Sequence, residues 1–551
     1  MHNSSTEQAA QREPTLSSLV DRLGPLARRR RRTVVAAIFL ALIFYGAGYW
    51  NSPERPDSSL DHPRLGWWGW FDQGEYYRSV KALEQDDFTP AEHLYPIGYP
   101  LVGTLLYPIM PQHPFLIPNL VCFIVICIVF LWICQKIVSP EEALLLCFFA
   151  VIWPITVRDN TIRPWTNTPV HAVLMILSYL ALFGSRNRVT GMVTGACAAI
   201  IFMMRPGDLV YSWPVMTALW FGARDWRDAW QRAIWFISGA APLAAVSLYF
   251  SFAIHGNVVS ESYRQASALV GFSFASLGIK LYTFFIDGFP LFGESRTLIT
   301  VFPFLLVVLP GVTFFIREFR WRALAILVTQ AGAIVYFLGY NDFWIVHLFK
   351  LQGIRYWLWL VPFCSLYSYM TFRFAWRTLG WIPTAAMILA PLLLFTIPRI
   401  GIRPVQWMPS LKIEPSQPFP QERISQDRRE FDWRCQAGAG GLCSMAIEFA
   451  EPVDFDIMEL KGVFPPGSLH RATVWVDNQR NISFHDFIAC EGPNLQDHLV
   501  FYGRKRGKSV RLVLPEAIGS EKVSVFGVDF AQRHVGLALR NPLRAFHPEL
   551  R

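Results

Sequence analysis

Charged residues are scarce in this chain of 551 residues. They make up 17% of it, whereas hydrophobic residues make up 53%. A single water-soluble core does not account for this composition, because about a quarter of the residues in an ordinary soluble domain are charged. The shortage of charge predicts that most of the chain lies in a lipid bilayer.

Metal-binding spacings of cysteine and histidine are absent as well. The nine cysteines form no CxxC pair, and no Cys/His pattern typical of structural zinc occurs. Six of the cysteines lie in apolar segments, where a thiol behaves as a small hydrophobic group. Cys435 and Cys443 flank a glycine-rich stretch near the C-terminus, and a disulfide between them is a hypothesis that requires an oxidising compartment.

The formal net charge is +9, and by its sign it would suit a nucleic-acid partner. The basic residues, however, stand in short clusters between apolar segments. This pattern sets the orientation of a membrane protein. We therefore expect a lipid bilayer and no nucleic acid as the partner of these charges.

Five consecutive arginines, residues 28–32, precede the apolar stretch 34–50. A cleaved signal peptide is the alternative to a membrane helix here, but no small-x-small cleavage site follows the stretch. We expect an uncleaved first transmembrane helix with the arginines on its cytoplasmic side. Residues 1–32 are predicted to be a disordered cytoplasmic N-terminus.

Ten further segments reach, or nearly reach, the length of a membrane span. Threading them alternately through the bilayer places every basic cluster on the cytoplasmic side, which supports a total of about eleven helices. The segments are 115–134, 141–157, 168–184, 190–204, 207–222, 232–254, 299–317, 321–340, 355–373 and 378–398. The stretch 95–111 is apolar but short and interrupted by prolines, so it is predicted to be interfacial or re-entrant.

The hydrophobic pattern changes after residue 398. Residues 399–424 contain five prolines and are predicted to be a linker. Segments such as 472–476 and 509–514 alternate partly between apolar and polar residues, with turn residues between them. Residues 425–551 are therefore predicted to form a β-sandwich of the jelly-roll type. An odd number of spans places this domain outside the cytoplasm.

Acidic and basic side chains recur in the loops expected on the outer face. Arginines there run against the usual charge bias of membrane proteins and need a local reason. A lipid phosphate supplies one, because a guanidinium binds phosphate oxygens in a bidentate manner. The candidate residues of these loops are Asp72, Glu75, Asp159, Arg163, Arg205, Asp342, His347, Lys350, Arg355 and Tyr356.

Several sequence features together resemble the GT-C glycosyltransferases. They are the acidic and aromatic stretch 71–77, the Pro-x-Gly-x-Pro segment 96–100, an acidic residue in the next outer loop, an Arg-Tyr pair at 355–356 and a soluble outer C-terminal domain. The chain is most similar to bacterial relatives of the protein O-mannosyltransferases and of the lipid A aminoarabinose transferase. The resemblance covers about residues 33–400, which includes the predicted transmembrane catalytic domain 33–398. It implies a polyprenyl-phosphate sugar as donor.

The resemblance also implies a role for individual residues. Asp72 stands at the place of the catalytic base, Glu75 supports it, and Asp159 matches the second acidic position. Arg355 and Tyr356 stand where the family binds the donor phosphate. Further candidates for phosphate binding are Arg163, Arg205 and Lys350. His347 and Asp342 are other candidate residues of the site. The second outer loop has no Asp-x-Asp motif, so no metal or other cofactor is assigned and a divalent metal stays an open question.

Glycosyl transfer needs a carboxylate near the acceptor hydroxyl and cations around the departing phosphate. One base suffices for an inverting displacement, which we expect, whereas a retaining one needs a carboxylate nucleophile as well. A structural alternative is that Asp72 and Glu75 form an exposed helix face paired with Arg78 or Lys81. Arginines at helix ends also extend to lipid headgroups without binding a substrate.

The sequence thus predicts an α-helical multi-pass glycosyltransferase of the cytoplasmic membrane. It would move a sugar from a polyprenyl-phosphate carrier to a hydroxyl of a glycan, lipid or protein at the extracytoplasmic face. A flippase or transporter of lipid-linked sugars is the alternative without catalysis, although inverted repeats typical of transporters are not evident. A glycan polymerase or ligase, which transfers a whole chain, is the alternative with catalysis.

Overall fold

The structure is a computed structural model of the chain. It describes residues 16–52, 54–56, 66–69, 71–185, 187–218, 220–221, 223–258, 272, 274, 277–285, 298–340, 352–382, 384, 398–404, 430–436, 443–463, 469, 472–482, 487–490, 496–514 and 522–537. Two compact units make up the chain. The first contains Met1–Asp87, Ile97–Met204 and Trp230–Leu243, and the second contains Phe88–Pro96, Arg205–Ala229 and Ala244–Arg551.

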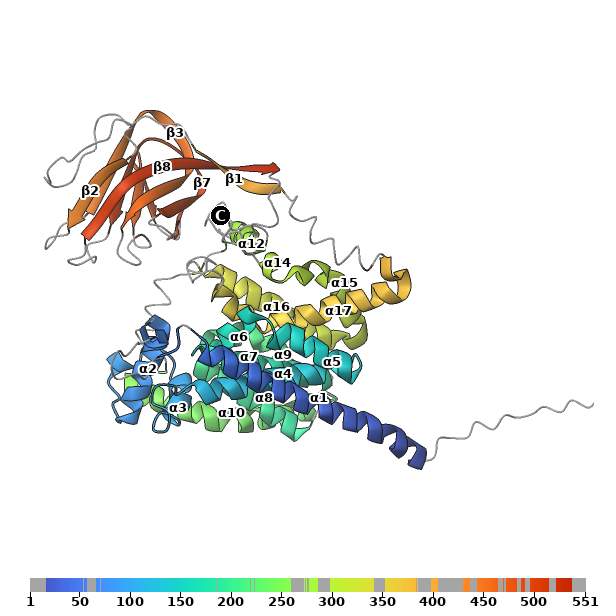
Figure 1. Ribbon diagram of the computed structural model, residues 1–551. Coiled ribbons are helices and arrows are strands. Elements are labelled where there is room, and N and C mark those ends of the chain that lie inside the picture. Colours follow the sequence, from blue (N-terminus) through green and yellow to red (C-terminus); the bar gives the residue numbers. More distant parts are fainter. Residues whose placement is uncertain are drawn as a thin grey trace, which may run out of the picture. The chain divides into compact units, whose positions relative to one another are not determined.

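Apolar helices pack side by side in the first unit, where α1 contacts α4, α4 contacts α7 and α7 contacts α8 (Figure 1). Shorter elements lie between them and carry several of the candidate residues. The helices are α1 (Leu16–Trp50), α2 (Phe71–Glu84), α3 (Gly98–Thr104), α4 (Leu116–Cys134), α5 (Pro140–Cys147), α6 (Ile155–Ile162), α7 (Asn167–Phe183), α8 (Arg188–Met204) and part of α10 (Trp226–His255). A 3-10 turn, η1 (Gly66–Gly69), precedes α2, and a π-helical turn, η3 (Phe148–Ile152), follows α5.

Helix α1 runs antiparallel to α4. Near one end Arg30 donates a hydrogen bond to the carbonyl of Gln135 at 3.4 Å, and towards the other Tyr45 donates to the carbonyl of Leu116 at 3.2 Å. The helix has 35 residues and begins at Leu16. Residues 16–32 are therefore helical, in contrast to the disordered N-terminus predicted from sequence, because Leu, Ala and Arg favour continuation of the helix.

Helices α8 and α10 approach each other at backbone distance through glycines. A methyl group placed on Gly195 would overlap the carbonyl of Phe236, and one on Gly239 would overlap the carbonyl of Met192. Gly191 lies one turn before Gly195 and faces Trp235. Small residues spaced in this way allow two apolar helices to pack closely where lipid offers no hydrophobic driving force.

The second unit contains a further group of helices. Thr329 on α16 accepts a hydrogen bond from the backbone amide of Val215 on α9 at 3.1 Å, which joins these two helices. Gly311 on α15 lies against the carbonyl of Tyr367 on α17. The elements are η2 (Pro90–Glu92), η4 (Pro206–Asp208), α9 (Leu209–Thr217), α12 (Leu277–Phe285), α14 (Leu298–Val301), η5 (Pro303–Val307), α15 (Val308–Phe319), α16 (Trp321–Gly339), η6 (Gln352–Trp357) and α17 (Leu360–Leu379).

Four helices among the described residues are long and apolar enough to cross a membrane. They are Ala27–Trp50, Leu116–Cys134, Trp226–His255 and Trp321–Gly339, and the pair Pro140–Ile152 and Ile155–Ile162, bent by 62°, gives a fifth if it counts as one span. The shortage of charge thus predicted a mainly helical protein with apolar helices of membrane length, as found.

The eleven predicted spans are not confirmed. Helices α7 and α8 are apolar but have 17 residues each, and α9 has nine. Nine helical residues rise about 14 Å, whereas the hydrocarbon core of a bilayer is about 30 Å thick. Helix α3 in the stretch 95–111 has seven residues and is also too short to cross. Most of the predicted span 378–398 lies outside the described residues.

An antiparallel sheet of eight strands follows the helices of the second unit. The strand order is β1-β8-β3-β7-β4-β5, with β2 also paired to β8 and β6 to β7. The apolar faces of the long strands meet in one core, where the ring of Phe455 lies 5.6 Å from that of Phe501 and 4.9 Å from that of Phe530. The strands are β1 (Pro398–Pro404), β2 (Glu430–Gln436), β3 (Cys443–Val463), β4 (Thr473–Val476), β5 (Gln479–Ile482), β6 (Phe487–Cys490), β7 (Gln496–Leu514) and β8 (Lys522–Leu537).

The sheet begins earlier in the chain than the sequence predicts. Strand β1 lies in the segment predicted as a linker, and it pairs with β8 from Pro398 opposite Leu537 to Pro404 opposite Ala531. The structure supports a C-terminal antiparallel sheet, while its jelly-roll type stays a prediction. The side chains of Cys435 and Cys443 lie outside the described part, so their disulfide also stays a hypothesis.

Candidate functional site

Helix α2 carries the acidic stretch that the sequence singles out. Asp72 lies in its first turn, where a negative charge is favoured by the helix dipole, and its side chain is half-buried. Glu75 forms an ion pair with Arg78, one turn later, and the arginine side chain is 47% exposed. The pairing that the structural alternative assumes is thus present for Glu75. Asp72 shares a helix face with the buried Tyr76, four residues later.

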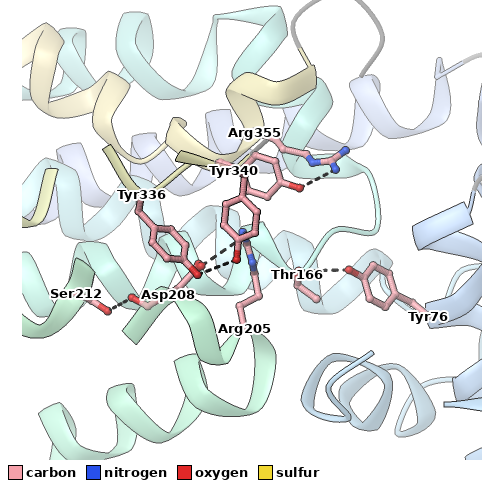
Figure 2. Close-up of polar contacts among 9 residues, drawn as sticks. Tyr76, Thr166, Arg205, Asp208, Ser212, Tyr336, Tyr340 and Arg355 are labelled. Atoms are coloured by element: carbon pink, nitrogen blue, oxygen red, sulfur yellow. Dashed lines mark hydrogen bonds and ion pairs between the residues drawn. The ribbon is translucent and has the colours of Figure 1, made fainter. Parts of the chain in front are cut away.

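Tyr76 brings this face of α2 to the junction between α6 and α7. Its hydroxyl lies 3.5 Å from the hydroxyl of Thr166 (Figure 2). Thr166 is three residues beyond Arg163, where α6 has ended. Pro164 explains this end, because the residue before a proline favours an extended backbone, and Arg163 has φ −68° and ψ 147°.

Arg163 is the centre of a chain of polar contacts. Its guanidinium binds the carboxylate of Glu54 at 3.1 Å. Its carbonyl accepts a hydrogen bond from Asn119 Nδ2 at 2.9 Å, and Asn119 Oδ1 accepts one from the hydroxyl of Tyr99 at 3.1 Å. Asn119 and Tyr99 are both buried. This chain fixes the backbone between α6 and α7 to α4 and α3.

Asp159 lies beyond the bend between α5 and α6, outside the four candidate spans. Arg158 Nε approaches its carboxylate at 3.6 Å. Burial raises the pKa of Asp159 above the ordinary carboxyl value, while Arg158 and Arg163 act against this rise. The side chain of Arg158 also lies against Gly48 of α1, where a methyl group would come within 2.8 Å of Nε.

The candidate acids of the first unit lie at one end of the α1–α4 pair. Trp67 in η1, just before α2, packs on Tyr49 near the end of α1, with ring centroids 5.2 Å apart. Glu54 follows the same end of α1, and Gly48 receives Arg158 there. The arginine run begins at the other end, where Arg30 contacts Gln135. Asp72, Asp159 and Arg163 therefore belong to the end opposite the arginines.

A cluster of arginines and aromatic rings forms in the second unit. The guanidinium carbon of Arg205 lies 4.6 Å from the ring centroid of Tyr356 and 5.2 Å from that of Phe337. The guanidinium carbon of Arg355 lies 4.9 Å from the same Tyr356 ring, and its Nη2 donates to the Tyr356 hydroxyl at 2.9 Å. We name Arg205, Arg355, Tyr356 and Phe337 the arginine–tyrosine cluster.

Asp208 anchors Arg205 in this cluster. Its carboxylate lies 3.5 Å from Arg205 Nη2 and is 2% exposed (Figure 2). Pro206 interrupts the chain between α8 and η4, and Arg205 leaves the helical conformation with φ −155° and ψ 84°. Burial raises the pKa of Asp208 above the ordinary carboxyl value, and Arg205 and Tyr211 act against this rise.

Helix α16 supplies the wall beside Arg205. The hydroxyls of Tyr336 and Tyr340 lie 3.0 Å apart (Figure 2). Gly207 lies against Tyr336, and a methyl group there would overlap the tyrosine hydroxyl. Lys280 on α12 is fully buried and donates to the carbonyls of Leu338 and Tyr340, where the negative end of the α16 dipole favours a cation.

The residues predicted from sequence belong to both units. Arg205, Arg355 and Tyr356 come together in the second unit. Arg163 is paired with Glu54 in the first unit, which also holds the predicted acids. Asp342, His347 and Lys350 lie outside the described residues. In the part of the chain that the structure describes, no group of three or more His, Cys, Asp and Glu side chains is arranged to hold a metal ion.

Three polar residues of these networks escaped the sequence reasoning. Asn119 and Lys280 are single polar residues within apolar stretches, which is a usable signal because such residues are expensive in lipid. Glu54 gives a weaker signal, since acids are common just outside a membrane span. Its importance depends on Arg163, 109 positions later in the chain.

Comparison with known proteins adds no family to this geometry. No family model matches the chain, and no curated protein matches it. The function is therefore argued from the residues and contacts described above.

Proposed function

We propose that this chain is an integral membrane glycosyltransferase that takes a sugar from a polyprenyl-phosphate carrier and passes it to an acceptor hydroxyl. The observation that carries the proposal is the arginine–tyrosine cluster. Arg205 and Arg355 both lie within 5 Å of the ring of Tyr356. Both cations lie against the same ring, so a phosphate bound beside Tyr356 would be attracted by two guanidiniums.

The surroundings of the cluster strengthen its attraction for an anion. Arg355 is 2% exposed and the side chain of Arg205 is 17% exposed, so little water screens either charge. The rings of Tyr356 and Phe337 lie 4.6 Å apart in a stacked arrangement and fix the orientation of Arg205. Guanidinium groups oriented in advance bind a phosphate with a smaller loss of entropy.

Glycosyl transfer moves a proton from the acceptor while negative charge develops on the leaving phosphate. An acceptor hydroxyl gives its proton to a carboxylate, its oxygen forms the new bond to the anomeric carbon, and the bond from that carbon to the phosphate oxygen breaks. The leaving polyprenyl phosphate keeps the electron pair and gains negative charge, which the two arginines stabilise most as the bond breaks. Asp72 is the proposed base, a role that rests on the sequence resemblance and on its half-buried place at the start of α2.

Two substitutions separate these roles. Asp72→Asn keeps the shape of the side chain and removes the proton acceptor, so turnover should fall about a hundredfold or more while donor binding stays near normal. Arg355→Ala should weaken donor binding as well as turnover, because it removes a contact that is already present before reaction. Purified protein, a polyprenyl-phosphate sugar and separate assays of binding and transfer provide the measurement.

Glu75→Gln is the matched control for Asp72→Asn, since Glu75 is engaged with Arg78 on the same helix. It should retain most of the activity. Arg355→Lys keeps the buried positive charge and so serves as the control for Arg355→Ala. The unfolding temperature of each variant shows whether the fold is preserved. Unchanged transfer in Asp72→Asn would remove the catalytic assignment, and donor translocation without transfer would favour the flippase.

A further inference from the structure

The run of five arginines at the start of the first apolar helix is divided between two faces of α1. Arg29 and Arg30 make contacts with other parts of the protein. Arg29 is 66% exposed and lies 3.9 Å from the carboxylate of Glu141, and Arg30 donates to the carbonyl of Gln135 at 3.4 Å. A signal for membrane orientation needs only the number of charges. Membrane orientation alone therefore does not explain why the arginines are divided over two faces of α1.

The other three arginines line a groove on the outside of the helix. The groove is shallow and open to its surroundings, with a volume of about 480 Å³. Its lining residues are Arg28, Arg31, Arg32, Val35, Ala36 and Phe39. They recur at intervals of three and four, which is the spacing of a single face of an α-helix.

This face changes from basic to apolar along the helix axis. The three arginines are exposed, and so are Val35 at 59% and Phe39 at 62%. Arg32 and Phe39 are separated by about 10 Å along the axis, given a rise of 1.5 Å per residue. A phospholipid has the same order of groups over a similar depth, with its phosphate at the membrane surface and its acyl chains below.

We propose that this groove binds an anionic phospholipid of the leaflet next to the arginine run. The headgroup phosphate is held by Arg28, Arg31 and Arg32, whose guanidiniums suit phosphate oxygens. The upper acyl chain lies on Val35, Ala36 and Phe39. The site is independent of the proposed transfer reaction, because it lies at the end of α1 opposite to Asp72.

Two double substitutions with equal charge change test this site. Arg31→Gln with Arg32→Gln alters the groove, whereas Arg29→Gln with Arg30→Gln removes the same charge from two arginines that do not line it. The full-length protein in detergent is titrated with phosphatidylglycerol, phosphatidylcholine or inorganic phosphate, and bound lipid is counted by native mass spectrometry. We expect the groove double to weaken phosphatidylglycerol binding about tenfold or more, because each basic residue near an anionic lipid contributes about 1 kcal/mol.

The control double should keep its affinity for phosphatidylglycerol within about twofold. Equal losses in both doubles would mean a diffuse attraction to net charge and would overturn the proposal, as would full affinity in the groove double. Competition by inorganic phosphate at equal concentration would identify a free-phosphate site instead of a lipid site. Phe39→Ala provides a variant that keeps every arginine, and it should weaken the lipid without affecting inorganic phosphate.

Discussion

Asp208 combines burial with a nearby arginine, and burial has the larger influence on its charge. Its pKa is raised above the ordinary carboxyl value despite Arg205 and Tyr211. The folded protein therefore holds a proton on Asp208 over a pH range in which the unfolded chain has released it. Stability that depends on this proton is complete below the ordinary pKa and decreases as the pH rises through the raised pKa.

Asp208→Asn should remove this dependence. Between the ordinary and the raised pKa, the free energy of unfolding of the unaltered protein should fall with increasing pH more steeply than that of the variant, by at most about 1.4 kcal/mol per pH unit. Unfolding temperatures measured in detergent across this range provide the check. Glu84→Gln, at an exposed carboxylate, should keep the slope of the unaltered protein. A variant slope equal to that of the original would contradict the raised pKa.

The sequence singled out charges that are unexpected in their surroundings, and this criterion found Arg205 and Arg355, while the family resemblance added Tyr356. The structure brings these three into contact. The same criterion did not pair Arg163 with Glu54, because the pairing depends on how distant helix ends meet. Candidate residues can thus be predicted from the sequence, whereas their contact partners can be identified only from the folded structure. Glu75 binds Arg78, the pairing that the structural alternative assumes, and its supporting role stays a prediction.

Helix packing depends on positions where a side chain is absent. Gly195 on α8 and Gly239 on α10 lie against backbone carbonyls of the opposite helix. Gly195→Leu should therefore force these helices apart and destabilise the protein by about 1–3 kcal/mol or more, the usual cost of overpacking. The measurement is thermal unfolding of the detergent-solubilised protein.

Gly46 provides the matched control, because it lies in α1 with nothing within 4 Å of an added methyl group. Gly46→Leu should leave stability unchanged or raise it slightly, since leucine favours a helix more than glycine does. Equal loss of stability in both variants would show that the effect of Gly195→Leu does not arise from the close α8–α10 contact.

Element lengths were the least predictable part of the fold. Helices α1, α4, α10 and α16 each contain a long apolar stretch, and the sequence found each of these stretches. The mean hydropathy of a segment does not reveal where a helix is interrupted, as at the 62° bend between η3 and α6. Pro154 follows η3 at this point and removes a backbone donor from the helix. The helix-sized apolar stretch therefore becomes two shorter elements.

The antiparallel pair α1 and α4 makes the orientation of the whole first unit testable. If the arginine run faces the cytoplasm, Lys136 should face it too, and Lys81 on α2 should lie outside. A cysteine at Lys81 should react with an impermeant maleimide in intact cells, whereas one at Lys136 should react only after permeabilisation. Both variants are made without the reactive native cysteines. Reaction of both sites from the same side would contradict the arrangement.

The late position of β8 in the sequence determines when the C-terminal sheet can form. It is the last described strand, and it pairs with β1, β2 and β3. Synthesis at about 5–20 residues per second means that roughly ten seconds separate the completion of β1 from the start of β8. During this interval β1 and β2 have been made, but β8, with which both pair, has not. Unpaired strands are prone to associate with other chains. The helices that precede the sheet can assemble earlier during synthesis, but the sheet closes only after β8 has been made.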